Sequence, residues 1–322
     1  MIFFFLQTLV LLLCLLITIA YYTLLDRKIL GAIQRRTGPN VVGFFGLLQP
    51  FADGLKLFVK ETIIPASSNT RLFLLAPVWT FWLSLVGWSV IPFTSYGAIV
   101  QTKYSLLFIL AVSSLGILGV LMAGWSSNSK YSFLGALRST AQMISYEVSL
   151  SLIIVAVLLV SSSTNLLSIT LAQEHIGLWN CWFLLPQFLL FFISAIVETN
   201  RAPFDLPEAE AELVAGFFTD YSSLAFALFF LAEYSSMLIM SACISILFFG
   251  GFMSPFGQMD QSWWFGLKNS IFCFLWVHVR ASFPRYRFDQ LMAIGWKLFL
   301  PLALALTLAY TSLLTILWFC LS

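Results

Sequence analysis

The stretch from Met1 to Leu25 reads MIFFFLQTLVLLLCLLITIAYYTLL and contains no charged residue. A run of this length can cross the hydrocarbon core of a bilayer as an α-helix, which needs about 20 apolar residues. Because the run has no basic start and no small-residue cleavage site, we expect a retained first membrane span rather than a signal peptide. It also lacks the Arg- and Ser-rich composition of a transit peptide.

The chain that follows is equally poor in charge. Of its 322 residues, 60% are hydrophobic and 9% are charged, whereas soluble domains carry about 25% charged residues. This composition excludes a water-soluble globule and predicts a single polytopic transmembrane domain over residues 1–322. No alternating pattern suggests a β-barrel, so the predicted fold class is all-α. Eight transmembrane helices are expected near residues 2–25, 72–92, 104–123, 144–162, 181–197, 222–250, 265–283 and 296–319.

Basic residues mark one side of this arrangement. Of the 16 Lys and Arg residues, 14 lie in or beside the odd-numbered loops between the expected spans, and the exceptions are Lys103 and Lys268. Under the positive-inside rule these loops face the cytoplasm or the matrix, and both termini face the opposite side.

The first loop is long and is expected to contain a helix of its own. After the segment DRKILGAIQRRTGPNVVG (26–43), the segment FGLLQPFADGLKLFVKE (45–61) places apolar residues at helical spacing, with Asp53, Lys56 and Lys60 on the opposite side. This pattern predicts an amphipathic helix that lies at the membrane surface and packs against a partner.

The fifth loop contains the densest group of acids in the chain. The stretch ETNRAPFDLPEAEAEL (198–213) includes one base, Arg201, and the acids Glu198, Asp205, Glu208, Glu210 and Glu212. Two interpretations remain open. Asp205 and Glu208 fit a capping box for the next helix. Glu208 and Glu212, however, would repel each other at i,i+4 spacing unless one of them is protonated, which favours a site that handles protons.

Three further charged residues fall inside expected spans, where charge is costly and indicates function by default. Glu147 follows a polar run of Ser, Thr and Gln, whose hydroxyl groups we interpret as interhelical contacts. Glu233 lies deep in the sixth span, and Lys268 near the start of the seventh is a candidate counter-charge.

The seventh loop, VRASFPRYRFDQLM (279–292), is basic and aromatic. Its Arg280, Arg285 and Arg287 are placed to pair with the acidic loop on the same side. Anchoring of anionic phospholipid is the alternative role for these arginines.

Redox and nucleotide chemistry find no support in this sequence. Its five cysteines are scattered without metal-ligand spacing, and its two histidines are too few for a membrane haem. A Gly-rich nucleotide loop is also missing. We therefore expect no metal, no redox centre and no nucleotide site in this chain.

Four stretches occur in this order in the odd loops: DRKILGAIQRRTGPNVVGFFGLLQPFADGLKLFVKE, GWSSNSKYSFLGALRSTAQMISYEVSL, ETNRAPFDLPEAEAELVAGF and VRASFPRYRFDQLM. Together, on a chain of this length with eight expected spans, they resemble subunit 1 of NADH–ubiquinone oxidoreductase, respiratory complex I. The resemblance covers the whole chain, and the four stretches look most like the mitochondrial forms of plants and algae.

The resemblance implies a membrane subunit of an H⁺-translocating NADH:ubiquinone reductase in the mitochondrial inner membrane. In this family the subunit joins the membrane arm to the peripheral arm and walls the chamber through which ubiquinone reaches the last iron–sulfur cluster. It binds no cofactor itself, because NADH, FMN and the Fe–S clusters belong to partner subunits. The implied partners are the peripheral quinone-site and terminal Fe–S subunits, neighbouring small membrane subunits, ubiquinone and phospholipid, without nucleic acid.

Two sets of residues are candidates for these roles. The proton relay would comprise Glu147, Glu198, Asp205, Glu208, Glu210, Glu212, Glu233 and Lys268. The quinone chamber and its loop contacts would comprise Arg27, Arg35, Arg36, Asp53, Arg201, Arg280, Arg285 and Arg287. The chain departs from the family at Asp26 and Asp220, where Glu is usual, and at His278, where Trp is common. The sequence therefore does not predict the hydrogen-bond distances at the two shorter acids. It also does not predict the packing around His278.

Two other functions also remain open. A stand-alone secondary transporter for protons or a small anion needs acids and bases in its spans as well, but the sequence shows no internal repeat or paired broken helices. A purely structural docking platform would use the basic first loop for subunit contacts alone.

Overall fold

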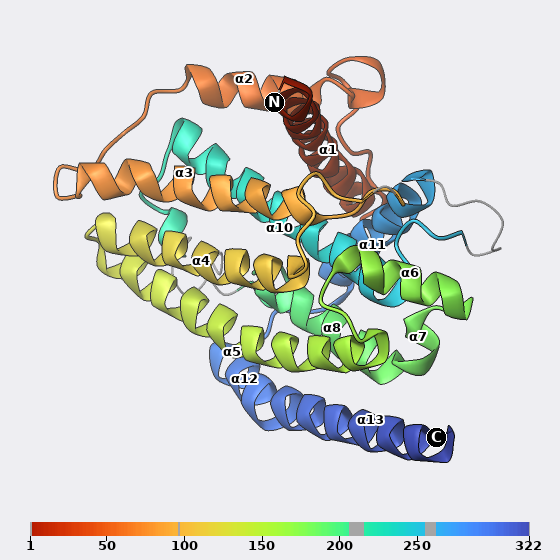
Figure 1. Cartoon of the computed structure of the whole chain (residues 1–322). Coiled ribbons are helices and arrows are strands. Elements are labelled where there is room, and N and C mark those ends of the chain that lie inside the picture. Colours follow the sequence, from red (N-terminus) through yellow and green to blue (C-terminus); the bar gives the residue numbers. More distant parts are fainter. Residues whose placement is uncertain (1, 96, 206–215, 255–261, 322) are drawn as a thin grey trace.

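The structure, a computed structural model, describes residues 2–95, 97–205, 216–254 and 262–321. In these parts of the chain the regular structure is helical (Figure 1), apart from one isolated bridge between Thr94 and Gly97. The long helices are α1 (Ile2–Ile33), α3 (Thr70–Val86), α4 (Ser105–Ser126), α5 (Lys130–Ser161), α10 (Ser223–Phe249), α11 (Ser262–Ser282) and α13 (Leu300–Leu321). The shorter helices are α2 (Gln49–Val59), α6 (Leu166–Ile176), α7 (Asn180–Phe183), α8 (Leu185–Glu198) and α12 (Phe288–Ile294). Single turns are η1 (Phe44–Gly46), η2 (Gly87–Val90), η3 (Gly216–Phe218) and the π-helical η4 (Gly295–Phe299).

Among the described residues, six helical stretches are long and apolar enough to cross a membrane, which confirms an all-helical polytopic membrane protein. They are Phe5–Ile33, Thr70–Val90, Ser105–Ser126, Lys130–Ser161, Ser223–Phe249 and Phe288–Ile316. The two other expected spans correspond to α8, which is apolar but has only 14 residues, and to α11, which carries Lys268 and Arg280.

The polar segment 130–147 is helical, whereas the expected span began only at residue 144. α5 begins at Lys130, and the hydroxyl of its N-cap Ser129 accepts a hydrogen bond from a backbone N–H of the first turn. The hydroxyl groups of Ser139 and Ser145 donate to carbonyl groups one turn back in the same helix. The prediction of a loop was wrong because these buried side chains are satisfied within the helix and do not need water.

The amphipathic helix expected in the first loop is present as α2, although it is shorter than the segment 45–61, and its place at the membrane surface stays a prediction. Pro50 lies in its first turn, where the missing N–H costs no helical hydrogen bond. Gly46 before it has a φ of 76°, and a side chain there would collide with the carbonyl of Pro39. Leu55 and Phe58 on its outward face are 67% and 72% exposed, so α2 presents an apolar surface.

The central helix is α10. In its apolar stretch 67% of the residues are buried, against 22–44% in the other five candidate spans. It contacts α1, α3, α8 and α11, while α13, α5, α4 and α3 follow one another across the molecule (Figure 1). A charged residue on the inner faces of α10 is therefore surrounded by protein rather than by lipid.

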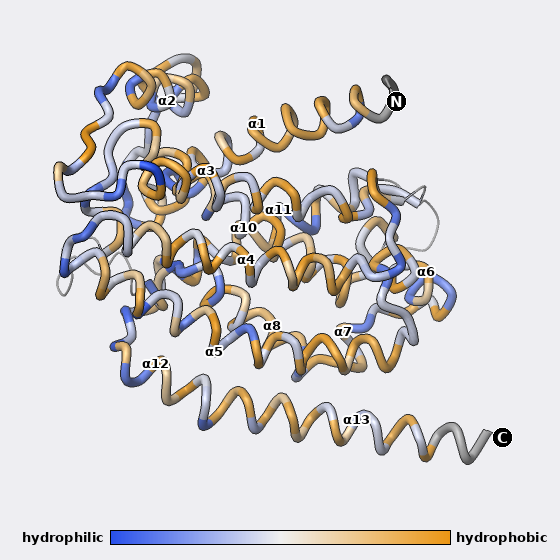
Figure 2. Tube along the Cα trace, turned by 60° about the vertical axis from the view of Figure 1, so that its left-hand side comes forward, coloured by the Kyte–Doolittle hydropathy of each residue, from blue (hydrophilic) through white to orange (hydrophobic). Residues whose placement is uncertain are grey.

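The two ends of the molecule differ. Both termini lie at one end of the long helices, whereas α2 and α12 lie at the other end (Figure 2). The same view shows that α1 and α13, which flank the bundle, are apolar along most of their length.

Candidate functional site

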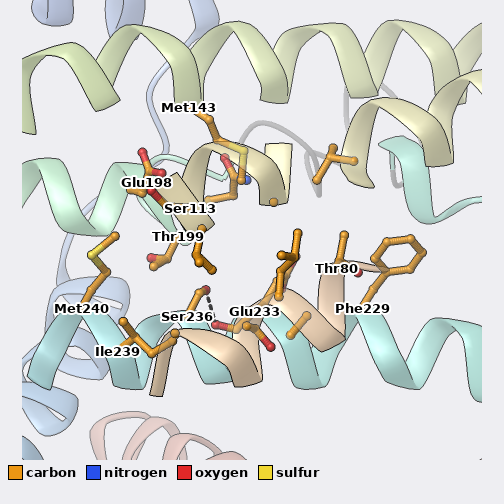
Figure 3. Close-up of a pocket in the computed structure, with 18 of the residues that line it drawn as sticks. Thr80, Ser113, Met143, Glu198, Thr199, Phe229, Glu233, Ser236, Ile239 and Met240 are labelled. Atoms are coloured by element: carbon orange, nitrogen blue, oxygen red, sulfur yellow. Dashed lines mark hydrogen bonds between the residues drawn. The ribbon is translucent and has the colours of Figure 1, made fainter. Parts of the chain in front are cut away.

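A cavity of about 130 Å³ between α3, α4, α8 and α10 brings two of the predicted acids together. Glu198 reaches it from the end of α8, and Glu233 reaches it from α10 (Figure 3). Its other polar lining residues are Thr80, Ser84, Ser113, Thr199, Asn200 and Ser236. Most of its lining is apolar, but a cavity of this size with several polar lining groups has room for a few water molecules. We call it the acid chamber.

Glu198 is the last residue of α8, and its side chain is buried. Its Oε2 atom has no hydrogen-bond partner among the described residues, although most buried polar atoms have one. Ser113 of the chamber wall donates to Glu147 Oε1 at 3.5 Å, the long limit of a hydrogen bond. Glu147 therefore lies behind the wall of the acid chamber.

Glu233 forms an ion pair with Arg201, whose Nη2 lies 3.2 Å from Glu233 Oε2. Arg201 is 4% exposed, and its guanidinium also lies over the ring of Tyr234, 4.4 Å from the centroid. The connection after α8 turns at Asn200, which has a φ of 51°, and this turn directs Arg201 into the bundle. The sequence analysis predicted both Glu233 and Arg201 as site residues, but it did not predict that they form an ion pair.

A second ion pair lies where α1, α10 and α11 meet. Asp26 Oδ2 accepts a hydrogen bond from Arg280 Nη1 at 2.7 Å and another from the hydroxyl of Tyr234 at 3.0 Å. Asp26 is buried, so its charge is balanced by these two donors rather than by water. The ring of Tyr22 packs edge-on against that of Tyr234, with centroids 5.4 Å apart.

The acidic and basic loops are joined through Asp205. Arg285 Nη2 lies 3.4 Å from Asp205 Oδ2, the backbone N–H of Tyr286 donates to Pro203 O at 3.1 Å, and the ring of Tyr286 stacks on Phe204. Of the three arginines expected to face the acidic loop, Arg285 therefore makes that contact and Arg280 pairs with Asp26. Arg287 is the N-cap residue of α12, and its backbone N–H donates to the side chain of Gln290.

The basic residues of the first loop lie at the surface. Arg27 pairs with Asp53 of α2 at 2.5 Å, with both side chains partly exposed, and Gln49 also donates to Asp53. Arg35 and Arg36 follow the end of α1 and are exposed. An exposed ion pair stabilises a fold by at most about 1 kcal/mol, so this contact orients α2 on α1 more than it holds the two together.

Lys268 is not the counter-charge of Glu233, and that prediction was wrong. Its ammonium donates to the carbonyl groups of Phe249, Gly251 and Met253 at 2.6, 2.9 and 2.7 Å. Phe249 ends α10, and it lies roughly 24 Å along the helix axis from Glu233 at the usual rise per residue. Arg201 occupies the place beside Glu233 instead.

The remaining predicted acids, Glu208, Glu210 and Glu212, lie outside the described residues. The same holds for the capping box proposed between Asp205 and Glu208. Their assignment to the proton relay stays a prediction.

An apolar groove of about 810 Å³ runs along α1 and α11. Its lining includes α1 residues from Leu6 to Leu25 and α11 residues from Ser262 to Cys273, with Trp88 and Leu238 from neighbouring elements. At its inner end it reaches Tyr22, whose ring contacts Tyr234. The groove therefore lies on the apolar flank of the bundle and is one ring contact away from Tyr234, which donates to Asp26.

The departures from the resembled family are all accommodated. Asp26 reaches its two partners despite the shorter side chain, and Asp220 Oδ2 accepts a hydrogen bond from the hydroxyl of Ser129 at 2.6 Å. Burial raises the pKa of the neighbouring Tyr221 to about 12, although the hydrogen bond with Ser126 lowers this pKa in part. The ring of His278 stacks on Phe274, with centroids 5.6 Å apart.

Residues that the sequence did not single out complete the site. Tyr22 and Tyr234 connect the groove to the ion pairs, and Gln142 of α5 donates from Nε2 to Val197 O and Phe204 O at 2.8 and 3.0 Å. The sequence feature that could have indicated a role for Gln142 is its position, as an amide, in the polar run before Glu147. Within the described ranges, no group of three or more His, Cys, Asp or Glu could hold a metal ion.

The chain is similar to known proteins over nearly its whole length. The sequence profile of the NADH dehydrogenase family matches residues 6–311. The NADH-ubiquinone oxidoreductase chain 1 of Chondrus crispus is 56% identical over 299 residues, which cover 90% of this chain and 90% of the relative. An NADH-quinone oxidoreductase subunit of Paramagnetospirillum magneticum is 54% identical over 317 residues, covering 96% of this chain and 92% of the relative. The NADH-ubiquinone oxidoreductase chain 1 of Arabidopsis thaliana is 54% identical over 309 residues, covering 93% of each.

Proposed function

This chain belongs to the NADH dehydrogenase family and is a membrane subunit of NADH:quinone oxidoreductase, respiratory complex I, and we propose that it couples quinone reduction to proton translocation. In this proposal it also walls the access route of ubiquinone. The observation that carries the proposal is the acid chamber, in which Glu198 and Glu233 share one small cavity inside the bundle.

The physical argument starts from the substrate. Ubiquinone is neutral, and its reduction adds up to two negative charges within the protein. In surroundings of low dielectric constant these charges act strongly on nearby ionisable groups. Carboxylates close to new negative charge gain protons, and carboxylates further along can pass protons on. Buried acids with neighbouring water and hydroxyl groups are suited to this task.

The relay that we propose in the described residues runs through Glu198, Glu233 and Glu147. The first two line the acid chamber, and the third contacts Ser113 of its wall. Asp205 forms an ion pair with Arg285 of the basic seventh loop. Glu208, Glu210 and Glu212 remain proposed members on the grounds of sequence alone. Lys268 is left out of the relay, because it binds carbonyl groups at the far end of α10.

The groove along α1 and α11 supports the access role. Its walls are mainly apolar, as a lipid-soluble quinone with an isoprenoid tail requires. Tyr22 in its lining contacts Tyr234 of the Asp26 cluster, and Arg27 of α1 and the loop with Arg35 and Arg36 follow it along the chain. We propose that this basic end faces the peripheral subunits that hold NADH, FMN and the Fe–S clusters, and that the chain itself binds no cofactor.

We also propose eight membrane crossings in one domain. Two termini at the same end (Figure 2) require an even number of crossings, and α8 and α11 add two to the six candidate spans. The basic loops then face the matrix or cytoplasm and both termini face away from it. The algal and plant relatives are named ubiquinone oxidoreductase chains, and with them we favour the mitochondrial inner membrane over a bacterial membrane.

The test uses the assembled complex in liposomes. We expect Glu233→Gln and Glu198→Gln to lower both NADH:ubiquinone activity and proton translocation about tenfold or more, because each removes a proton-transferring group. NADH oxidation by a water-soluble artificial acceptor should be unchanged, since that reaction takes place in the peripheral subunits.

The control is Glu61→Gln, which changes an exposed acid outside the chamber and should leave all three rates at the wild-type level. Normal pumping by both chamber variants would mean that these acids are structural and would refute the coupling role.

A further inference from the structure

Two ion pairs, each with one buried member, lie close to one tyrosine. Arg280 and Asp26 pair between α11 and α1, the two helices along which the groove runs. Arg201 and Glu233 pair at the acid chamber, between the loop after α8 and α10. Asp26 and Arg201 are 5% and 4% exposed, so salt and water screen these charges little.

Tyr234 contacts both pairs. Its hydroxyl donates to Asp26 Oδ2 at 3.0 Å, the same oxygen that accepts from Arg280. The face of its ring lies 4.4 Å from the guanidinium carbon of Arg201. Tyr234 is 8% exposed and follows Glu233 directly in the central helix α10.

We propose that Tyr234 is the positioning residue that links the two ion pairs, so that a change of charge or position at Asp26 alters the Arg201–Glu233 pair at the acid chamber. The inference rests on the proposed function and deepens it, because it names the contact through which the groove side acts on the chamber side. Tyr234 needs no proton transfer for this role, since it acts by holding Asp26 with its hydroxyl and Arg201 with its ring.

The geometry explains why a tyrosine is needed. The hydroxyl reaches a buried carboxylate that Arg280 alone satisfies only in part. The aromatic face stabilises the second cation without neutralising it, which leaves Arg201 able to hold Glu233. A leucine would keep part of the packing and lose both contacts.

The first experiment compares Tyr234→Phe with Tyr146→Phe in the assembled complex in liposomes. Tyr234→Phe keeps the ring under Arg201 and removes only the hydrogen bond to Asp26. The matched control Tyr146→Phe removes one equally buried hydrogen bond, which goes to Leu291 O at 3.0 Å and touches neither ion pair. We expect a loss of roughly tenfold in coupled NADH:ubiquinone activity for Tyr234→Phe alone, with unchanged oxidation of NADH by an artificial acceptor.

The second experiment is a double-mutant cycle with Asp26→Asn. If one contact carries the link, Asp26→Asn combined with Tyr234→Phe should be no worse than the more severe single variant. Asp26→Asn combined with Tyr146→Phe should instead multiply the two separate effects. Wild-type activity of Tyr234→Phe, or effects of Tyr234→Phe and Asp26→Asn that multiply, would overturn the proposal.

A spectroscopic measurement covers the case in which Tyr234→Phe does not assemble. The infrared carboxyl band of Glu233 is first assigned by its loss in Glu233→Gln. Asp26→Asn should shift this band if the two ion pairs are linked, and an unshifted band would refute the link. The proposed function fails separately, when Glu233→Gln pumps normally, and the band shift then still decides whether the link exists.

Discussion

A lysine buried in a membrane protein needs acceptors for three N–H groups, and Lys268 finds them at the end of α10. Three carbonyl groups surround its ammonium within 2.9 Å, and the ring of Trp179 lies 5.1 Å from it. The end of a helix carries partial negative charge on its unpaired carbonyls, which favours a cation there. The role of a buried charged side chain in this protein thus depends on partners from other helices and loops. Asp26 of α1, which pairs with Arg280 of α11, is a second example.

The position of Lys268 predicts a structural role. We expect Lys268→Met to destabilise the subunit by about 3 kcal/mol, because it leaves three carbonyl groups unpaired, and to lower the thermal denaturation midpoint of the complex by a few degrees. Proton translocation per NADH should stay normal in complexes that remain assembled. Lost pumping at an unchanged midpoint would instead restore Lys268 to the proton relay.

At the scale of elements, α5 and the loop after α8 depend on each other. One side-chain amide, that of Gln142, donates to Val197 O in the last turn of α8 and to Phe204 O beyond the loop. The residues between these two carbonyls include Glu198 and Arg201, so the amide closes the loop that carries both charges. Since Gln142 is fully buried, these two hydrogen bonds have no water to replace them.

This clamp can be tested by replacing the amide. Gln142→Met removes both hydrogen bonds and should destabilise the subunit by about 2 kcal/mol, with lower NADH:ubiquinone activity at an unchanged rate with an artificial acceptor. Gln142→Glu should be worse, because an ionised carboxylate would face two carbonyl oxygens. Ser151→Ala, on the exposed side of the same helix, is the control. Equal activity of Gln142→Met and Ser151→Ala would contradict the role of the clamp.

At the scale of the whole molecule, the distribution of the basic residues agrees with the directions in which the helices run. The helices carry the arginine-bearing loops to one end and both termini to the other (Figure 2). The acid chamber lies inside the bundle against the central helix α10, and the groove lies on its flank along α1 and α11. The Asp26, Tyr234 and Arg201 cluster stands between these two spaces.

The topology predicts opposite labelling at two introduced cysteines. Lys60→Cys follows α2 and Ile176→Cys ends α6, and both positions are exposed. A membrane-impermeant maleimide added to sealed vesicles should label only one of them, and added to inverted vesicles only the other, because an odd number of crossings separates the two positions. Labelling of both from one side would refute the eight-crossing arrangement.

Composition and residue pattern were enough to establish the class of the protein and the inventory of its charges. Nine per cent charged residues cannot cover a soluble globule, so a helical membrane protein followed from composition, and an acid at position 233 was suspect because charge in a span is costly. Helix ends were less predictable, since the polar start of α5 satisfies its own hydroxyl groups. The pairing of the charges came from the folded chain alone. Glu233 could have faced Lys268 or Arg201, and the turn at Asn200 gave it Arg201. Coulomb energy depends on distance, and distances between segments far apart in sequence are set by packing.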